Sequence, residues 1–266
     1  MLSLPGQEPL EHLDPASISL TGHALFLDFD GTIAEIVTHP DAAWPSARWS
    51  RLVPRLRERF EGALAIVTGR ELGDVEKRFP ESRPMAIGAM YGSLRRSHSG
   101  QLTEAAADLA DVFAEIGAHV SAFTAPHHGL LVEEKSAGVS LHYRARPELE
   151  SFCLALMQEA TAPYDFIEIM PGKRVFEARP VAVDKGRCIA AFLLEPPFEG
   201  RVPVFAGDDV PDEEGFRLVN TRGGVSIKVG DGDSAARYRC ASPTALAAWL
   251  EAVVVKKKTL ARQEAL

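Results

Sequence analysis

Short apolar runs alternate with amphipathic segments along the first hundred residues of the chain. Residues 24–28 and 63–68 are apolar up to their last position, which is typical of strands buried on both faces of a sheet. Helical periodicity follows each run, over residues 46–60 and from about residue 71, and a third strand is predicted over residues 86–95. Strands that alternate with helices indicate a parallel sheet covered on both faces.

The pattern changes in the middle of the chain. Two helical segments, 104–120 and 147–161, stand among short strands with glycine between them. These strands are predicted over residues 129–134, 138–143, 166–170 and 174–178. Short paired runs of this kind indicate antiparallel hairpins and hence a separate α+β module.

After residue 184 the first pattern returns. The expected elements are a helix to 194, a strand over 202–206, a helix near 213–219, a strand over 225–229 and a helix over 242–254. The predicted fold class is therefore α/β, a Rossmann-like parallel sheet core with helices on both faces plus an inserted α+β module. The predicted boundaries are 20–104 and 181–255 for a discontinuous core, 105–180 for the insert, and 1–19 and 256–266 for tails.

Composition narrows the possible classes of protein. The chain has 266 residues, 46% hydrophobic and 25% charged, as in ordinary soluble globular proteins. A net charge of −8 argues against nucleic-acid binding. The N-terminus is too acidic and too rich in proline for a signal peptide, and residues 245–255 are too few to span a bilayer. Three separated cysteines indicate a reducing compartment, so a cytoplasmic monomer without membrane contact is expected.

Carboxylates follow two of the apolar runs. Asp28 and Asp30 end the first run, where the two-residue period of a strand places both on one side, and the acidic segment 207–214 follows the strand at 202–206. The carboxyl ends of parallel strands meet at one edge, where such folds bind ligands. Two carboxylates 4 Å apart repel by roughly 4 kcal/mol at an effective dielectric of about 20. A divalent cation is therefore expected at this edge, and oxygen ligands favour Mg²⁺.

Simpler interpretations of these carboxylates stay open on the sequence alone. Residues 28–31 could form a polar turn that closes a strand, and Asp208 could belong to an acidic first helical turn with Glu213 and Glu214. A calcium-binding EF-hand is excluded, because Ile33 and His39 stand where that loop needs Gly and Glu.

Thr68 and Lys185 add groups suited to an anion. Thr68 ends the second strand, so its hydroxyl and the following N–H groups can face a phosphate, although a plain helix cap is an alternative. Lys185 follows Asp184 at a helix start, where a cation opposes the helix dipole, so a role that faces negative charge is favoured. A carboxylate nucleophile, a hydroxyl, a lysine and an acidic metal cluster together describe phosphoryl transfer through an aspartyl phosphate.

Four segments resemble, in order, the motifs of the haloacid dehalogenase superfamily phosphatases. They are Asp28-Phe29-Asp30-Gly31-Thr32, the Thr of IVTGR at 66–70, the Lys of DKG at 184–186 and GDDVPDE at 207–213. The insert resembles the C2-type cap of that superfamily. More narrowly, the chain is similar to the trehalose-6-phosphate phosphatase family from about Leu25 to Leu250, through VEEK at 132–135, SLHYR at 140–144, PGKRVFEARP at 171–180, IKVG at 227–230 and AARY at 235–238.

Two positions depart from the family pattern. Met90-Tyr91-Gly92 stands where the family usually has a turn like Gly-His-Gly, so the contact made by that histidine is in question. Pro211 stands where threonine is common, and proline is compatible with a first helical turn.

The resemblance implies a mechanism for the core residues. Asp28 is expected to attack phosphorus, and Asp30 to protonate the leaving sugar oxygen and then to deprotonate the attacking water. Thr68 and Lys185 are expected to neutralise the phosphoryl oxygens. The expected Mg²⁺ ligands are Asp28, the Asp30 carbonyl and Asp208, and the expected groups that orient its waters are Asp209 and Asp212.

The resemblance also implies a substrate, trehalose 6-phosphate, and a role in trehalose biosynthesis. The residues expected to bind this sugar phosphate are Arg70 and, in the cap, Glu133, Lys135, His142, Arg144, Lys173, Glu177 and Arg179. From the residues alone, Glu133 with Lys135 and His142 with Arg144 share strand faces, which suits either sugar hydroxyls or an ordinary charged surface. The alternatives are a phosphatase for sucrose phosphate or mannosyl phosphoglycerate, or a catalytically silent sensor of sugar phosphates. A sensor is expected to have lost Asp28, Asp30 or Lys185, and this chain retains all three.

Overall fold

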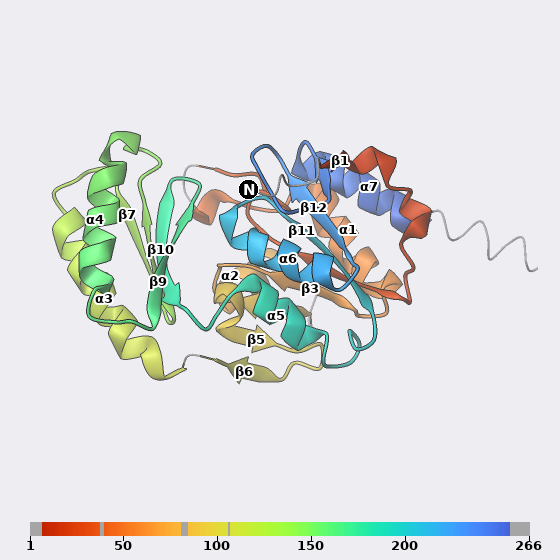
Figure 1. Ribbon diagram of the computed structural model, residues 1–266, viewed down its shortest axis with the longest axis horizontal. Helices are drawn as coiled ribbons and strands as arrows, with labels where there is room; N and C mark the ends of the chain where they lie inside the picture. The colour runs from red at the N-terminus through yellow and green to blue at the C-terminus, as the bar shows by residue number, and fades with distance from the viewer. Residues whose placement is uncertain (1–6, 38–39, 81–84, 106, 256–266) are drawn as a thin grey trace, which may run out of the picture.

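A nine-stranded sheet forms the larger part of the molecule (Figure 1). The computed structural model describes residues 7–37, 40–80, 85–105 and 107–255. In spatial order the strands of this core sheet are β1 (Glu8–Pro9), β13 (Tyr238–Cys240), β12 (Val225–Val229), β11 (Val202–Gly207), β2 (His23–Leu27), β3 (Leu64–Val67), β4 (Ala86–Ala89), β5 (Leu94–Arg96) and β6 (Leu102–Glu104). The pairs from β1 to β4 are parallel, and β5 and β6 add antiparallel strands.

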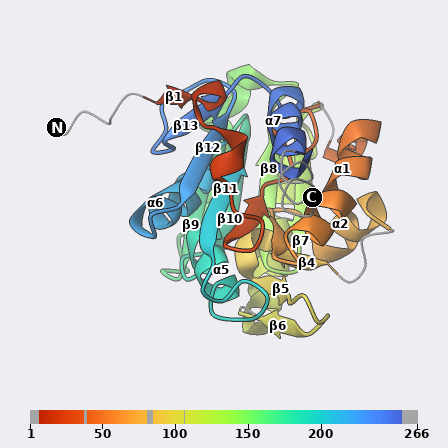
Figure 2. The same ribbon diagram turned by 90° about the vertical axis from the view of Figure 1, so that its right-hand side faces the viewer.

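Helices cover both faces of the core sheet, as Figure 2 shows for α1 and α7 on one side of β11 and β12 and for α6 on the other. The bounds are α1 (Ala47–Arg59), α2 (Leu72–Arg78), α5 (Lys185–Phe192), α6 (Glu213–Thr221) and α7 (Pro243–Val255). Strand β2 explains the two layers, because Leu25 and Leu27 face one hydrophobic cluster and Phe26 faces the other. The predicted α/β fold class is confirmed.

A four-stranded antiparallel sheet interrupts this pattern. The order of this cap sheet is β7 (Leu131–Lys135), β8 (Gly138–His142), β10 (Val175–Pro180) and β9 (Ile167–Gly172). Helices α3 (Ala110–Thr124) and α4 (Glu150–Thr161) pack on it around Phe113, Met157 and Phe176, which belong to a hydrophobic cluster separate from those of the core sheet. The other side of the cap sheet meets the carboxyl edge of the core sheet through hydrogen bonds such as that of Lys135 to the Gly69 carbonyl.

The predicted N-terminal tail is wrong for the part that the structure describes. Glu8 donates a backbone hydrogen bond to the Arg237 carbonyl, and β1 pairs with β13 at the edge of the core sheet. Leu10 and Ile18 are buried in the core. Burial of these apolar side chains against the core stabilises the folded protein, which explains why the segment packs there. A strand of two residues carries no periodicity from which it could be predicted. Residues 1–6 and 256–266 lie outside the described residues.

The third strand predicted over residues 86–95 is present as β4, but it ends at Ala89. Met90, Tyr91 and Gly92 have positive φ angles of 47°, 59° and 103°, and this turn reverses the chain so that β5 returns antiparallel to β4. The helix predicted from residue 104 begins at residue 110, and residues 102–104 form β6. None of the helices in the described ranges is long and apolar enough to cross a membrane.

Candidate active site

Asp28 follows the central strand β2, where the chain leaves the sheet. Its backbone N–H donates to the Ala206 carbonyl of β11 at 2.9 Å, which fixes the carboxylate at the carboxyl edge. Gly31 turns the chain with a φ of 77°, and a side-chain carbon at this glycine would overlap the carboxylate of Asp208. The loop after β2 and the loop after β11 therefore touch, as the parallel topology predicts.

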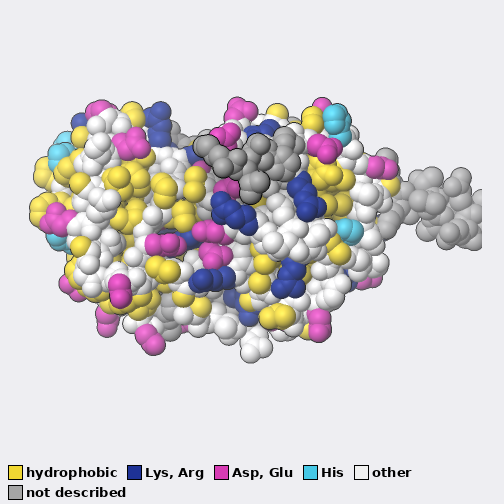
Figure 3. Space-filling view, viewed as in Figure 1, with side chains coloured by type: hydrophobic (Ala, Val, Ile, Leu, Met, Phe, Trp, Pro, Cys, Tyr) yellow, Lys and Arg dark blue, Asp and Glu magenta, His cyan; other side chains and the backbone are white. Residues whose placement is uncertain are grey.

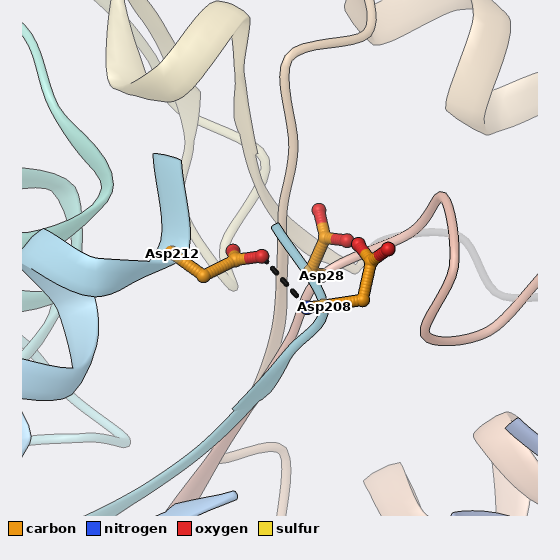
Figure 4. Close-up of side chains that lie close together, drawn as sticks. All are labelled: Asp28, Asp208 and Asp212. Atoms are coloured by element: carbon orange, nitrogen blue, oxygen red, sulfur yellow. Dashed lines mark hydrogen bonds between the residues drawn. The ribbon is translucent and has the colours of Figure 1, made fainter. Parts of the chain in front are cut away.

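Three buried carboxylates converge at this edge (Figure 4). Oxygen atoms of Asp28, Asp208 and Asp212 all lie within 4.8 Å of one another. Nζ of Lys185, at the start of α5, lies 2.5 Å from Oδ1 of Asp28 and 2.6 Å from Oδ1 of Asp212. Lys173, at the tip of the hairpin between β9 and β10, forms an ion pair with Oδ2 of Asp208. One lysine from the core and one from the cap thus reach the same acidic cluster.

The donor set fits a hard divalent cation. Asp212 uses both oxygens within the protein, Oδ1 for Lys185 and Oδ2 for the backbone N–H groups of Asp208 and Asp209 at 2.8 and 2.9 Å. Within the described part of the chain, Lys185 binds one oxygen of Asp28 and Lys173 binds one oxygen of Asp208. One oxygen on each of these two carboxylates therefore remains for a metal, and Mg²⁺ favours such ligands together with water.

The charge states explain why this cluster favours a cation. Burial raises the pKa of Asp28 well above its ordinary value, Lys185 opposes that rise, and Asp212 and Asp208 add to it. Burial and the neighbouring Asp212 likewise raise the pKa of Asp208 to about 7. Burial opposes the charge of Lys185, but Asp212 and Asp28 outweigh it and raise the pKa of this lysine above its ordinary value. Lys185 is a permanent cation inside an excess of negative charge.

Asp30 and Thr68 line the same cleft beside Arg70. Arg70 holds the Asp30 carboxylate with two hydrogen bonds of 2.7 Å, a bidentate arrangement, and reaches Asp74 at 2.5 Å. Thr68 ends β3, and its Oγ1 accepts a hydrogen bond of 3.2 Å from the Arg70 backbone N–H. Arg70 is buried while the Asp30 side chain is 42% exposed, so Asp30 faces the opening of the cleft.

The cap sheet contributes a second polar group opposite the carboxylates. Oε1 of Glu177 accepts hydrogen bonds from Lys135 at 3.0 Å and from Ser140 at 2.8 Å. Burial raises the pKa of Glu177 to about 7, against the lowering effect of Lys185. Glu133 lies 3.1 Å from Nε2 of His142.

Glu133 stays ionised in this setting. Burial opposes its charge, but the hydrogen bond from His142 and the charge of Lys135 outweigh burial and lower the pKa of Glu133 to about 2. Arg144 completes the group by donating to the Val37 carbonyl of the core at 2.7 Å. The cap thus presents charged and hydrogen-bonding side chains that can contact hydroxyl groups.

One cleft, with an empty volume of about 780 Å³ that is partly open to solvent, contains nearly all of these groups. In Figure 3 charged side chains of both signs gather where the two modules meet. The predicted site residues that line the cleft are Asp28, Asp30, Thr68, Arg70, Glu133, Lys135, His142, Arg144, Lys173, Glu177, Lys185, Asp208, Asp209 and Asp212.

Arg179 does not line this cleft. Its side chain is 2% exposed and forms ion pairs with Glu168 at 2.9 Å and Glu214 at 2.8 Å. The direct sugar contact predicted for Arg179 is therefore not supported, because its guanidinium is engaged by Glu168 of β9 and Glu214 of α6. Tyr91, Ile36 and Val37 line the cleft and were missed. The departure from the family pattern at residues 90–92 could have pointed to Tyr91, whereas no motif marks Ile36 or Val37.

The fold defines a class of protein. The structure is similar to a haloacid dehalogenase-like hydrolase from Bacteroides thetaiotaomicron, with a TM-score of 0.59 and 14% identity over 86% of this chain and 98% of that one. It is also similar to the C-terminal domain of trehalose-6-phosphate phosphatase from Candida albicans, with a TM-score of 0.82 and 22% identity over 95% of this chain and 99% of that one. The fold is that of the haloacid dehalogenase-like hydrolases.

Sequence comparison is more specific. The family model of trehalose-phosphatase matches residues 26–244. Trehalose-6-phosphate phosphatase of Escherichia coli K12 is 35% identical over 237 residues, which are 87% of this chain and 86% of that protein. The chain belongs to the trehalose-phosphatase family and is a phosphatase, which confirms the family predicted from the sequence motifs.

Proposed function

We propose that this protein hydrolyses trehalose 6-phosphate to trehalose and phosphate, as a step of trehalose biosynthesis. The observation that carries the proposal is the composition of the cleft, where Asp28 beside Lys185 faces the polar side chains of the cap sheet. One end suits a phosphoryl group and the other end suits sugar hydroxyls. The family match and the identity to the Escherichia coli enzyme support the same substrate.

The chemistry proceeds in two displacements at phosphorus. In the first, a carboxylate oxygen of Asp28 forms a bond to phosphorus, the bond from phosphorus to the sugar oxygen breaks, and Asp30 gives its proton to that oxygen. In the second, Asp30 takes a proton from a water molecule that attacks the aspartyl phosphate, which releases phosphate and restores Asp28. Arg70 pairs with the ionised form of Asp30, the form that the second step requires.

Lys185 and Thr68 stabilise the negative charge of the phosphoryl oxygens during both steps. Lys185 is 2.5 Å from Asp28, so its ammonium group favours the ionised form of the nucleophile against the effect of burial and offsets the negative charge on the phosphoryl oxygens. Thr68 directs its hydroxyl into the same end of the cleft, oriented by the Arg70 backbone. Fixed groups of this kind stabilise the transition state without rearranging during the reaction.

Mg²⁺ is part of the proposal. Asp28, the Asp30 carbonyl and Asp208 would hold it, and Asp209 and Asp212 would orient its water ligands; the carboxylate oxygens within 4.8 Å of one another support this set. When bound, the ion supplies positive charge that neutralises the phosphoryl oxygens. Lys173 pairs with the other oxygen of Asp208.

In the cap, we propose that the residues that bind the sugar are Glu133, Lys135, His142, Arg144, Lys173 and Glu177, all of which line the cleft. We also propose residues 105–180 as the cap and residues 20–104 with 181–255 as the catalytic core. Two separate sheets and separate hydrophobic clusters support that division. Buried free thiols at the three cysteines support a reducing compartment, and we propose a monomer in the cytoplasm.

A substrate panel tests the proposal. Phosphate release is measured from trehalose 6-phosphate, sucrose 6-phosphate, mannosyl phosphoglycerate and glucose 6-phosphate, each with Mg²⁺ and with a chelator. We expect kcat/KM for trehalose 6-phosphate to exceed the others and activity to disappear with the chelator. A higher kcat/KM for another sugar phosphate would identify that compound as the substrate instead. If no compound of the panel is hydrolysed, the proposal that the protein is catalytically active is refuted.

A further inference from the structure

Tyr91 occupies a strained turn at the base of the cleft. Its φ of 59° and ψ of 14°, with a φ of 47° at Met90, place two non-glycine residues in the left-handed region. The backbone N–H of Tyr91 donates to the Thr68 carbonyl at 2.8 Å, and that of Met90 donates to the Arg70 carbonyl at 3.0 Å. The turn is thus tied directly to the loop that carries Thr68, and the surrounding structure maintains a conformation that is unfavourable by itself.

The side chain of Tyr91 lies between the two modules. It is 7% exposed, and its hydroxyl donates a hydrogen bond to Oε2 of Glu177 in the cap sheet. The Arg179 guanidinium lies 5.2 Å from the centre of its ring, and Nζ of Lys185 lies 5.9 Å from it, both within the range of cation–π attraction. Gly69 makes room for the phenol, because a side-chain carbon there would overlap the ring.

Glu177 depends on donors from both modules. Lys135 and Ser140, which bind its Oε1, belong to the cap sheet. Tyr91, which binds its Oε2, belongs to the core. Since burial disfavours the charged carboxylate, each donor helps to keep Glu177 ionised and in one orientation.

We propose that Tyr91 is a positioning residue that orients the Glu177 carboxylate toward the sugar when the cap sheet lies on the core. This inference rests on the proposed function, because it takes Glu177 as a ligand of the sugar. Among the described residues, Tyr91 is the one side chain of the core that donates a hydrogen bond to Glu177. Tyr91 itself forms and breaks no bond in the reaction.

Steady-state kinetics of Tyr91→Phe test the proposal. The variant keeps the ring, and with it the contacts of Arg179 and Lys185, and loses only the hydroxyl. Leaving a buried charged acceptor without its donor is expected to raise KM for trehalose 6-phosphate about tenfold to fiftyfold. The loss of kcat/KM on p-nitrophenyl phosphate, which carries no sugar, is expected to be at least about tenfold smaller.

A double-mutant cycle separates positioning from a purely structural effect. In the Glu177→Gln background we expect Tyr91→Phe to change KM less than about threefold, because the carboxylate it orients is gone. Tyr164→Phe is the matched control, since Tyr164 donates to Glu115 at 2.9 Å on the outside of the cap and should retain wild-type kinetics.

Three results would overturn the inference. Equal losses on both substrates, or additive losses in the cycle, would show that Tyr91 supports the fold alone. An unchanged KM for trehalose 6-phosphate in Tyr91→Phe would show that its hydroxyl orients nothing. Absence of trehalose 6-phosphate hydrolysis by the wild-type enzyme would refute the proposed function, and the inference with it, before any variant is compared.

Discussion

Asp28→Asn separates the chemistry of the site from its stability. The amide cannot attack phosphorus, so we expect turnover of trehalose 6-phosphate to fall by at least about a thousandfold. The side-chain amide oxygen can still accept a hydrogen bond from Lys185, which keeps its second partner Asp212 at 2.6 Å. The variant should therefore fold as the wild-type protein does.

The magnitude of the stability change follows from the distances in the cluster. At 2.5 Å and an effective dielectric of about 20, Asp28 attracts Lys185 by roughly 6.5 kcal/mol. At the 4.8 Å limit for the cluster, Asp208 and Asp212 each repel Asp28 by roughly 3.5 kcal/mol. The attraction and the two repulsions nearly cancel, so the free energy of unfolding should change by no more than about 1–2 kcal/mol.

Two measurements check this prediction. Phosphate release with saturating Mg²⁺ gives the residual activity, and urea unfolding followed by circular dichroism gives the stability. Asp231→Asn, an exposed carboxylate in the loop after β12, is the matched control and should change neither. Residual activity above about 1% of wild type would refute the aspartyl-phosphate mechanism, and a loss of more than about 3 kcal/mol of stability would refute the charge balance.

Three further changes follow from the structure. Asp208→Asn removes a carboxylate that has one oxygen available for a metal, so Mg²⁺ should bind at least about tenfold more weakly in calorimetric titration. An unchanged affinity would show that Mg²⁺ binds elsewhere. Glu133→Gln should lower kcat/KM for trehalose 6-phosphate about tenfold to a hundredfold more than kcat/KM for p-nitrophenyl phosphate. Equal losses on both substrates would show that Glu133 only supports the fold. Leu10→Ala should destabilise the protein by about 2–4 kcal/mol in urea unfolding, and a change below about 0.5 kcal/mol would mean that residues 8–19 do not pack as described.

Much of the fold could be predicted because its central elements carry strong local patterns. The runs at β2 and β3 are apolar on both faces, and α1 lies within the helix predicted over residues 46–60. Strand β1, at the edge of the core sheet, and its neighbour β13 have two and three residues, and backbone pairing in the folded protein defines them. No window of sequence that short contains a period, so they could not be predicted.

The site could be predicted where topology alone brings residues together. Asp28, Thr68 and Asp208 each follow a parallel strand, and the ends of neighbouring parallel strands must meet. The family resemblance implied the same role for Glu177 and Arg179, which stand two residues apart on one strand. Their partners separate them, since Arg179 forms an ion pair with Glu214 of α6 while Glu177 lines the cleft. The strand period gives the face of a side chain, and tertiary packing decides what that face meets.

The charge of the cleft argues that metal, core and cap must act together on the substrate. Among the described residues, the cleft is lined by seven carboxylates and five Lys or Arg side chains, in a chain whose net charge is −8. A phosphate monoester brings further negative charge, so these side chains alone would repel it. A divalent cation at Asp28 and Asp208 would reverse that local balance at the phosphoryl end. The cap would then supply hydrogen bonds at the sugar end, where Tyr91 from the core contacts Glu177 from the cap. Affinity for a sugar phosphate therefore depends on the metal, which would offset the negative charge of the phosphate, and on the contact between core and cap, which places the side chains that would bind the sugar.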